Sequence, residues 1–336
     1  MICVAQIGCG YWGPNLLRNL VANSQCRVKS LCDLAAERRK YVSGLYPAID
    51  VTDDCQSVLA DPEIDAVVIA TPVFTHYDLA MRALGQGKHI LVEKPMAGTV
   101  EEVEHIRDLA REKGLIAMVG HTFLYNPAVR FLKKLVSSGQ LGNIRYIYSQ
   151  RLNLGRIRSD VDVLWNLGPH DISIIQYLLD DVSPLAVQRQ GMDYIQKGIE
   201  DTVFLNILYP GKVMAHVHVS WLDPQKVRRM TVVGEKKMVV YDDMAENKIA
   251  IFDKGIDRMA VLGENMDYDT HAFPTFTHRS GDLIMPRVNF QEPLKVEIQH
   301  FMDCIRGDAA CLTDANHALG VVNILNTNTH IRKMIP

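Results

Sequence analysis

The sequence predicts an α/β fold, namely a Rossmann-type doubly wound parallel sheet, followed by an α+β domain with a large open, mainly antiparallel sheet. Short apolar strands alternate with helices in the first part of the chain, and a glycine-rich turn follows the first strand. Later strand-like segments follow one another through short turns. Because 336 residues are enough for two cores, we predict an NAD-binding domain over 1–122 and a domain for substrate binding and oligomerisation over 123–336.

The composition is that of an ordinary globular protein, with 48% hydrophobic and 22% charged residues. A formal net charge of −3 gives no general attraction to nucleic acid or to anionic membranes. No apolar run approaches the roughly 18 residues of a membrane-spanning helix. The N-terminus has the pattern of a strand and not of a targeting signal. We therefore expect a cytoplasmic protein whose partners include neither nucleic acid nor membrane.

The cysteines do not indicate a metal site or a disulfide framework. There are 7, an odd number, and no two are spaced as a CxxC pair. His216 and His218 alternate on one face of a predicted strand, but no third ligand lies near them in the sequence. We expect reduced, buried thiols and no metal.

The glycine motif is the first functional signal. Ile2–Ile7 is an apolar strand, and a helix with proline in its first turn begins after the motif. In such a GxGxxG turn the first glycine permits the tight turn, the second lets a pyrophosphate approach, and the third allows close helix packing. The helix N-terminus then faces the phosphates. The predicted contacts are Gly8, Gly10, Tyr11, Trp12 and Gly13.

Asp33 ends the second predicted strand, 20 residues beyond Gly13. At that place a carboxylate accepts hydrogen bonds from the adenosine ribose and repels a 2′-phosphate, which favours NAD. Arg38 follows on the next helix and could accept such a phosphate, so NADP stays open as the second choice. Asp33 could instead, or in addition, cap that helix.

Two later strands end in proline at the edge where ligands bind in open α/β sheets. The fourth strand, 65–70, is followed by Thr71 and Pro72, and the fifth, 89–92, is followed by Glu93-Lys94-Pro95. A lysine at a strand tip is ordinarily a solvated charge. Here the parallel order brings Lys94 to the nicotinamide end of a bound cofactor.

The stretches GCGYWG, ATPVFTH and EKP together resemble the Gfo/Idh/MocA oxidoreductases, and the likeness covers nearly the whole chain. The resemblance implies an NAD(P)-dependent dehydrogenase acting on CH–OH groups. It implies that Lys94 is catalytic, beside both the nicotinamide and the substrate hydroxyl. It also places four residues of these motifs at the cofactor: Thr71, Pro72, His76 and Glu93.

A second family motif is matched in part. His170 occupies the place of the family histidine, but Asn166 stands where the family has aspartate, and the leading glycines are missing. This leaves Lys94 and His170 as the predicted catalytic pair. We expect His170 to come from the second domain and to open a helix after Pro169, where the helix dipole would lower the pKa of its ring.

The segment LGRIRSDVDVLW resembles the branch of the family that acts on nucleotide-linked sugars, which implies chemistry at C3 of such a sugar. The substrate-side candidates are Arg156, Arg158, Asn166 and His170. An arginine pair suits a diphosphate or a carboxylate, although surface ion pairs would explain it equally well. The alternatives are a dehydrogenase of a free sugar or inositol, and a regulator that binds NAD without catalysis.

The second half contains six further strand-like segments and two closing helices, from Glu292 and from Asp314. Thr313 is the expected cap of the last helix, which should extend to about Met334. Residues 255–289 have little regular pattern and are expected to form a long excursion over the sheet. The family resemblance implies that the open sheet face builds a homodimer or homotetramer.

Overall fold

A computed structural model describes residues 1–258 and 276–327. The chain forms two compact units, and each is built from separate stretches of sequence. Among the described residues, unit 1 contains 1–126, 164–181 and 290–327, and unit 2 contains 127–163, 182–258 and 276–289. The predicted boundary after residue 122 lies close to the end of the first stretch. The assignment of a cofactor role to 1–122 and of a substrate role to 123–336 stays a prediction.

Unit 1 is built on a six-stranded parallel sheet with the order β3-β2-β1-β4-β5-β6. This confirms the predicted doubly wound fold, in which the strand order reverses between β1 and β4. Because both faces are covered, the central strands β1 and β4 are buried along their whole length, whereas β2 and the edge strand β3 carry exposed polar residues. The strands are β1 Ile2–Ile7, β2 Cys26–Cys32, β3 Asp50–Thr52, β4 Ala66–Ile69, β5 His89–Glu93 and β6 Ala117–Gly120.

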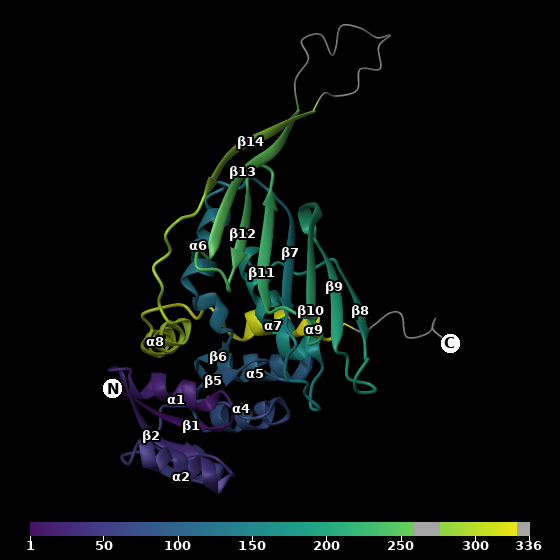
Figure 1. The fold of residues 1–336 in the computed structure, drawn as a ribbon. Helices are drawn as coiled ribbons and strands as arrows, with labels where there is room; N and C mark the ends of the chain where they lie inside the picture. Colours follow the sequence, from purple (N-terminus) through teal and green to yellow (C-terminus); the bar gives the residue numbers. More distant parts are fainter. Residues whose placement is uncertain (259–275, 328–336) are drawn as a thin grey trace, which may run out of the picture. The chain divides into compact units, whose positions relative to one another are not determined.

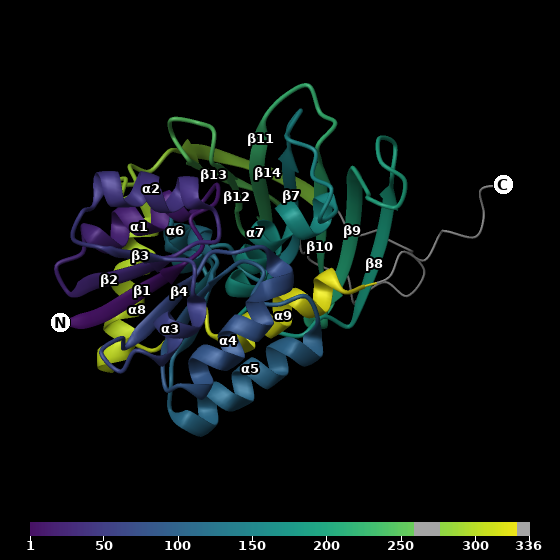
Figure 2. The same cartoon turned by 90° about the horizontal axis from the view of Figure 1, so that it is seen from below.

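Helices cover both faces of this sheet, as Figures 1 and 2 show. α8 packs beside α1 on one face, and α9 packs beside α5 and β6 on the other. α5 begins with a capping box between Thr99 and Glu102. None of the helices in the described ranges is long and apolar enough to cross a membrane. The helices are α1 Gly13–Val21, α2 Ala36–Leu45, α3 Cys55–Ala60, α4 His76–Gly85, α5 Val100–Lys113, α7 Val163–Leu178, α8 Pro293–Arg306 and α9 Ala315–Leu325, with short 3₁₀ turns η1 Val73–Thr75 and η2 Thr122–Tyr125.

The start of α7 differs from the prediction. We expected the helix to begin after Pro169, but it begins at Val163 and contains Pro169 in its interior. A proline there removes one backbone hydrogen bond, to the carbonyl of Trp165. Burial of apolar side chains on both sides of it, including Leu164 and Ile172, offsets that loss. His170 therefore lies inside a helix and within unit 1, so the argument from the helix dipole does not apply to it.

The last helix also differs from the prediction. Its N-cap is Asp314, whose side chain accepts a hydrogen bond from the His317 backbone N–H at 2.9 Å. Thr313 is instead buried and shares a hydrogen bond with the Tyr125 hydroxyl. The helix ends at Leu325, and the expected continuation beyond residue 327 lies outside the described residues.

Unit 2 is built on an eight-stranded sheet with the order β14-β13-β12-β11-β7-β10-β9-β8. Only β10 and β7 pair in parallel among these neighbours, which confirms the predicted mainly antiparallel sheet. α6 (Pro127–Ser137) packs against β12, and a 3₁₀ turn η3 (Pro210–Lys212) precedes β10. The strands are β7 Ile144–Leu152, β8 Ala186–Met192, β9 Thr202–Tyr209, β10 Val213–Ser220, β11 Val227–Gly234, β12 Met238–Asp242, β13 Ile249–Arg258 and β14 Phe276–Ile284.

The predicted excursion over the sheet is corrected at both of its ends. β13 continues to Arg258, and β14 pairs with it in antiparallel register, from Ile251 opposite Ile284 to Arg258 opposite Phe276. β14 is largely exposed, so no apolar alternation marks it in the sequence. Arg279 pairs with Asp257 across the two strands at 2.8 Å. Residues 259–275 of the excursion lie outside the described residues.

Candidate active site

Five loops lead away from the carboxyl edge of the unit 1 sheet, and each presents a residue with possible chemistry. Parallel strands end at the same edge, so loops from distant parts of the sequence gather there. This edge is also where ligands bind in doubly wound sheets. The first residues after β1, β2, β4, β5 and β6 include Gly8, Asp33, Thr71, Lys94 and His121, respectively.

The glycine loop has the shape that a dinucleotide requires. Gly8 has a φ of +94°, and a Cβ there would lie 2.6 Å from the carbonyl oxygen of Ala70. A Cβ on Gly13 would lie 2.8 Å from the Gly8 carbonyl oxygen, so close packing excludes a side chain at both positions. A Cβ on Gly10 would meet nothing within 4 Å, which leaves its backbone open to a phosphate. Tyr11 is 87% exposed beside it. The loop therefore fits a pyrophosphate.

Asp33 ties the glycine loop to the turn after β2. Its Oδ2 accepts a hydrogen bond from the Cys9 N–H at 2.6 Å, and its Oδ1 accepts one from the Ala35 N–H at 2.8 Å. The N-cap of α2 is Ala35, so Asp33 is not the cap. Arg39 binds the carbonyl of Asp33 and pairs with Asp53, whereas Arg38 is exposed.

His76 connects two of the loops. Its Nε2 lies 2.8 Å from the Thr71 carbonyl oxygen, and its Nδ1 lies 2.8 Å from the carbonyl oxygen of Pro95, which follows a cis peptide bond. The ring is 1% exposed, and burial lowers its pKa. His76 therefore holds the Thr71 loop against the Lys94 turn. Its direct contact with a cofactor stays a prediction.

Lys94 is held against α7. Its Nζ donates a hydrogen bond to the Asn166 carbonyl oxygen at 2.8 Å. His170 lies four residues further along the same helix and therefore on the same face. Its ring meets that of Phe123 edge to face, with 5.0 Å between centroids. The structure thus places Lys94 against the helix that carries His170, within unit 1, because α7 folds with the nucleotide-binding part of the chain.

Two buried carboxyl groups lie behind Lys94, and only one of them was a sequence candidate. Glu93 accepts a hydrogen bond from the Lys94 backbone N–H, and burial raises its pKa to about 7 although the Lys94 charge opposes the shift. Glu297 on α8 is fully buried and accepts a hydrogen bond from the Thr122 hydroxyl at 2.8 Å. Burial, with the charge of Glu93 in second place, raises its pKa well above the usual value. No local pattern marks Glu297 in the sequence.

The arginine candidates belong to unit 2. Arg156 and Arg158 lie in the exposed segment between β7 and α7. Arg158 makes a bidentate ion pair with Asp160, at 2.8 and 2.5 Å. The surface ion pair that the sequence left open is therefore present at Arg158, and its role toward a substrate stays a prediction.

Two histidine clusters fall outside this edge. His216 bonds the Asn206 side chain, and its ring stacks on Tyr148. In unit 1 the side chains of His300, Cys304 and Cys311 lie together, with 3.4 Å between Cys304 Sγ and His300 Nε2. The Leu312 N–H also donates to that nitrogen at 3.0 Å, so this cluster satisfies its hydrogen bonds within the protein. The sequence did not indicate it, because Cys311 joins it only through folding.

The fold and the glycine loop define a dinucleotide-binding protein of the Rossmann type. Residues 2–121 match the model of an oxidoreductase family with an NAD-binding Rossmann fold, and 129–240 match the C-terminal domain model of the same family. The chain belongs to the Gfo/Idh/MocA family of oxidoreductases, which confirms the family predicted from the sequence motifs.

Known relatives differ in their substrates. The chain is 26% identical to a scyllo-inositol 2-dehydrogenase (NAD⁺) of Bacillus subtilis, over 97% of this chain and 93% of the relative. It is 29% identical to a UDP-N-acetylglucosamine 3-dehydrogenase of Acidithiobacillus ferrooxidans, over 74% and 76%. A crystal structure of an oxidoreductase from Magnetospirillum magnetotacticum is 28% identical, with a TM-score of 0.79 over 96% of this chain and 98% of that one. Some other matches span little more than half of the relative's length.

Proposed function

We propose that the protein is an NAD-dependent dehydrogenase that acts on a carbinol or keto carbon, C3, of a nucleotide-linked sugar. The observation that supports this most is the arrangement around Lys94. Its ammonium group is held at the end of β5 by the Asn166 carbonyl, and His170 follows on the same helix face. The likeness to a UDP-N-acetylglucosamine 3-dehydrogenase supports the choice of sugar.

The cofactor would be held by the loops of the carboxyl edge. Gly8, Gly10 and Gly13 with the start of α1 would bind the pyrophosphate. Asp33 would bind the adenosine ribose and favour NAD over NADP. When bound, NAD supplies the acceptor for the hydride. The other proposed contacts are Tyr11, Trp12, Arg38, Thr71, Pro72, His76, Glu93 and Lys94.

Lys94 would act as the general base. In its amine form it would take the hydroxyl proton of the sugar as the carbon is oxidised. His170 would orient that hydroxyl or share the proton transfer. A protonated Glu93 would support this role, because a neutral carboxyl does not stabilise the ammonium form of its neighbour as a carboxylate would.

Arg156 and Arg158 would bind the diphosphate of the substrate, and Asn166 the sugar. A phosphate in place of Asp160 offers the Arg158 fork the same bidentate geometry. We also propose a cytoplasmic location for the protein.

A second candidate is a dehydrogenase of inositol or of a free sugar. The alignment with scyllo-inositol 2-dehydrogenase covers nearly the whole of both chains, whereas the UDP-sugar enzyme aligns over about three quarters. A third hypothesis is a regulator that binds NAD without catalysis. It does not explain why Lys94 and His170 are both present.

The deciding experiment follows NADH absorbance with UDP-N-acetylglucosamine, free N-acetylglucosamine and scyllo-inositol as substrates. The proposal expects kcat/KM for the UDP-sugar to exceed that for each free compound at least about a hundredfold, since the diphosphate contacts are lost in the free sugar. Faster turnover of inositol would favour the second candidate. Absence of NADH formation with a wider library of nucleotide-linked sugars and polyols would contradict a dehydrogenase.

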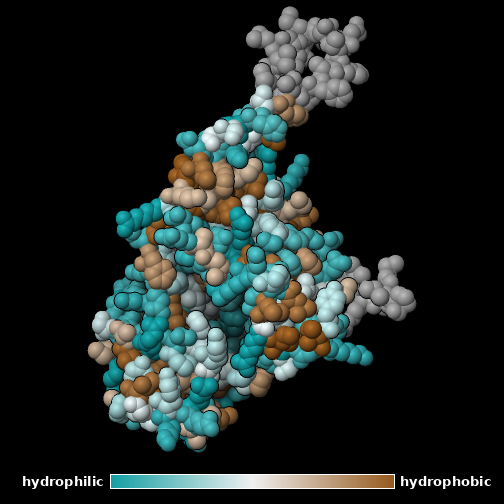
Figure 3. Space-filling view, viewed as in Figure 1, coloured by the Kyte–Doolittle hydropathy of each residue, from teal (hydrophilic) through white to brown (hydrophobic). Residues whose placement is uncertain are grey.

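We also propose that the open face of the unit 2 sheet joins copies of the chain into a homodimer or homotetramer. Met214 is 58% exposed and lies opposite Tyr146 on one neighbouring strand and Leu208 on the other. Figure 3 shows apolar atoms gathered over β9 and β10 and near β13 and β14. Light scattering on the purified protein would measure the mass, and a monomer at micromolar concentration would contradict this proposal.

A further inference from the structure

We propose that His121, His317 and Asp181 form a proton path that connects Lys94 to solvent within unit 1. The inference rests on the proposed function, since a dehydrogenase that takes a hydroxyl proton in an enclosed site has to release it. None of the three residues was a candidate for function from the sequence. Each link of the path is supported by a separate observation.

The first link joins Lys94 to His121. Glu93 pairs with Gly120 in the parallel register of β5 and β6, so the next residues, Lys94 and His121, leave the sheet side by side. His121 is 1% exposed, and its carbonyl accepts the Leu124 N–H at the start of η2. Burial, followed by the charges of His317 and Lys94, holds the pKa of His121 well below its usual value. A neutral ring has one N–H and one lone pair, as a relay requires.

The second link joins the two imidazole rings. The rings of His121 and His317 meet edge to face, with 5.1 Å between centroids. Nδ1 of His121 and Nε2 of His317 are both buried, and neither has a hydrogen-bond partner among the described residues. Buried polar atoms in folded proteins are nearly always hydrogen-bonded. The proximity of the rings suggests a common explanation, namely that these two nitrogens share a proton directly or across one water.

The third link reaches the surface. Nδ1 of His317 lies 2.7 Å from Asp181 Oδ1, and while the His317 side chain is 2% exposed that of Asp181 is 47% exposed. Asp181 follows α7 with a φ of +55°, and Asp180 before it has a φ of +56°. Two successive left-handed residues other than glycine are uncommon, and such backbone strain gathers at functional positions. The unusual turn places the carboxylate against His317.

Proton transfer along this path balances without a redox step. The sugar hydroxyl gives its proton to the Lys94 amine, and Lys94 gives a proton to one nitrogen of His121. His121 releases the proton of Nδ1 to Nε2 of His317, and His317 releases the proton of Nδ1 to Asp181, which gives it to solvent. One proton enters and one leaves. Each ring ends with its proton on the opposite nitrogen, and ring rotation or passage in the reverse reaction restores it.

Two other titratable groups near Lys94, His76 and Glu93, offer no comparable exit. His76 has both ring nitrogens at backbone carbonyls. Glu93 leads to Glu297, which is fully buried, and then to the Thr122 hydroxyl. Among these groups in the described structure, the path through His121 is the one that ends in a half-exposed carboxylate.

Stopped-flow kinetics with a pH-indicator dye in weak buffer tests the path. The enzyme, NAD and UDP-N-acetylglucosamine are mixed, and proton release is compared with NADH formation. In the wild type the two should coincide. In His317→Phe, proton release should lag NADH formation at least about tenfold and recover when imidazole is added to the medium. Asp181→Asn should show a smaller lag. The exposed His105→Phe on α5 is the control and should behave as wild type.

His317→Gln is the second variant, because the protein with a buried phenylalanine at this position could fail to fold. The glutamine amide can bond Asp181 but cannot transfer a proton onward, so the same lag is expected. Coincident proton release and NADH formation in both folded variants would overturn the proposal. So would a lag that imidazole does not shorten.

A second measurement does not depend on turnover. NMR of ¹⁵N-histidine-labelled protein should find the proton on Nδ1 in both His121 and His317, and His317→Phe should shift the Nδ1 resonance of His121. A proton on Nε2 of His317 would overturn the path. If none of the sugars tested supports NAD reduction by the wild type, the proposed function fails. The NMR measurement then decides by itself whether the two histidines carry their protons as the relay requires.

Discussion

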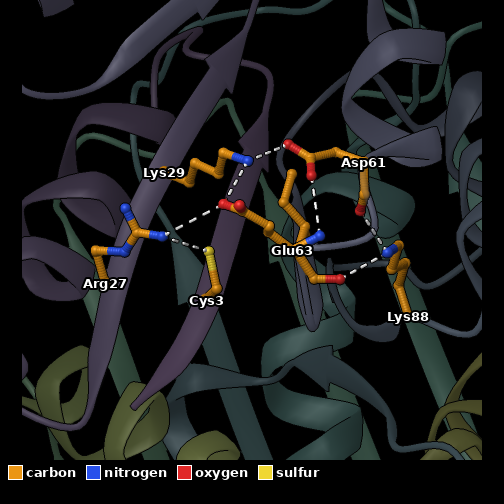
Figure 4. A network of polar contacts seen from close by, with 7 residues as sticks. Cys3, Arg27, Lys29, Asp61, Glu63 and Lys88 are labelled. Carbon is orange, nitrogen blue, oxygen red and sulfur yellow. Dashed lines mark hydrogen bonds and ion pairs between the residues drawn. The ribbon is translucent and has the colours of Figure 1, made fainter.

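The two edges of the unit 1 sheet differ in how fully their buried polar groups are hydrogen-bonded. At the amino edge, shown in Figure 4, Lys88 is 6% exposed and donates to the carbonyl oxygens of Asp61 and Ile64, both at 2.7 Å. Lys29 lies between the carboxylates of Asp61 and Glu63, at 2.5 and 2.9 Å. Their hydrogen bonds hold the loop before β4 to its neighbours.

At the carboxyl edge, buried polar atoms without a hydrogen-bond partner among the described residues gather around Lys94. These atoms are Glu93 Oε1, His121 Nδ1, Glu297 Oε1 and His317 Nε2. The polar groups of the amino edge therefore contribute to stability, whereas those of the carboxyl edge retain hydrogen-bonding capacity for a ligand or a proton. Substitutions of the same kind at the two edges should therefore have different effects.

The largest expected effect is that of Lys94→Met on catalysis. Removal of the proposed base should lower kcat about a thousandfold, while NAD affinity, followed by the fluorescence of Trp12 and the other tryptophans, stays within about threefold. The melting temperature should change little, since Lys94 is only partly buried. The exposed Lys40→Met is the control. Turnover above a few per cent of wild type would show that Lys94 is not the base.

Lys88→Met should have the converse effect. Two buried carbonyl oxygens, of Asp61 and Ile64, would lose their donor, which should lower the free energy of unfolding by about 3 kcal/mol. kcat per folded enzyme should be unchanged, because the amino edge lies away from the proposed site. Urea denaturation and active-site titration measure the two quantities. A loss of activity without a loss of stability would contradict the assignment of the amino edge to stability alone.

Asp33→Ser tests the cofactor end of the carboxyl edge. Loss of the carboxylate removes its repulsion of a 2′-phosphate, so the preference for NAD over NADP in kcat/KM should fall about tenfold or more. Asp33→Asn removes the charge but keeps an oxygen that can accept the hydrogen bond from the Cys9 N–H. It therefore distinguishes the effect of the charge from the effect of losing that hydrogen bond. An unchanged ratio in both variants would contradict the assignment of Asp33 to the ribose.

Glu297→Gln tests the buried carboxyl groups through the pH dependence of stability. Because folding raises the pKa of Glu93 and of Glu297, the folded protein binds more protons than the unfolded chain above about pH 4.5. The free energy of unfolding should therefore decline as the pH rises from about 4.5, and for Glu93 this decline ends near pH 7. Each carboxyl group contributes at most about 1.4 kcal/mol per pH unit.

The variant should flatten this decline and be more stable than wild type at pH 8, as measured by urea denaturation from pH 5 to 8. Glu292→Gln, at the N-cap of α8, is the matched control. Arg18 lowers the pKa of Glu292, so its replacement should give no gain at high pH. Parallel curves for Glu297→Gln and wild type would show that Glu297 does not titrate in this way.

The features predicted correctly from the sequence are those whose patterns lie within short stretches of the chain. The glycine loop is a strand, a turn and a helix in direct succession, and the parallel strands are apolar runs bounded by turn residues. Local signals failed where contacts from elsewhere decide the outcome. The start of α7 depends on burial of Leu164 and Ile172, and β14 forms by pairing with β13 although both of its faces are largely exposed.

The class of the protein could be predicted from the sequence alone, because the glycine turn, Asp33 and the strand-ending Lys94 lie in motifs whose residues are close together in the chain. The surroundings of Lys94 depend on tertiary contacts. Glu297 reaches Thr122 across 175 positions of sequence, and Asp181 reaches His317 across 136. Burial removes water from Glu297 and raises its pKa, and burial is a property of the packed unit that no local stretch of sequence encodes.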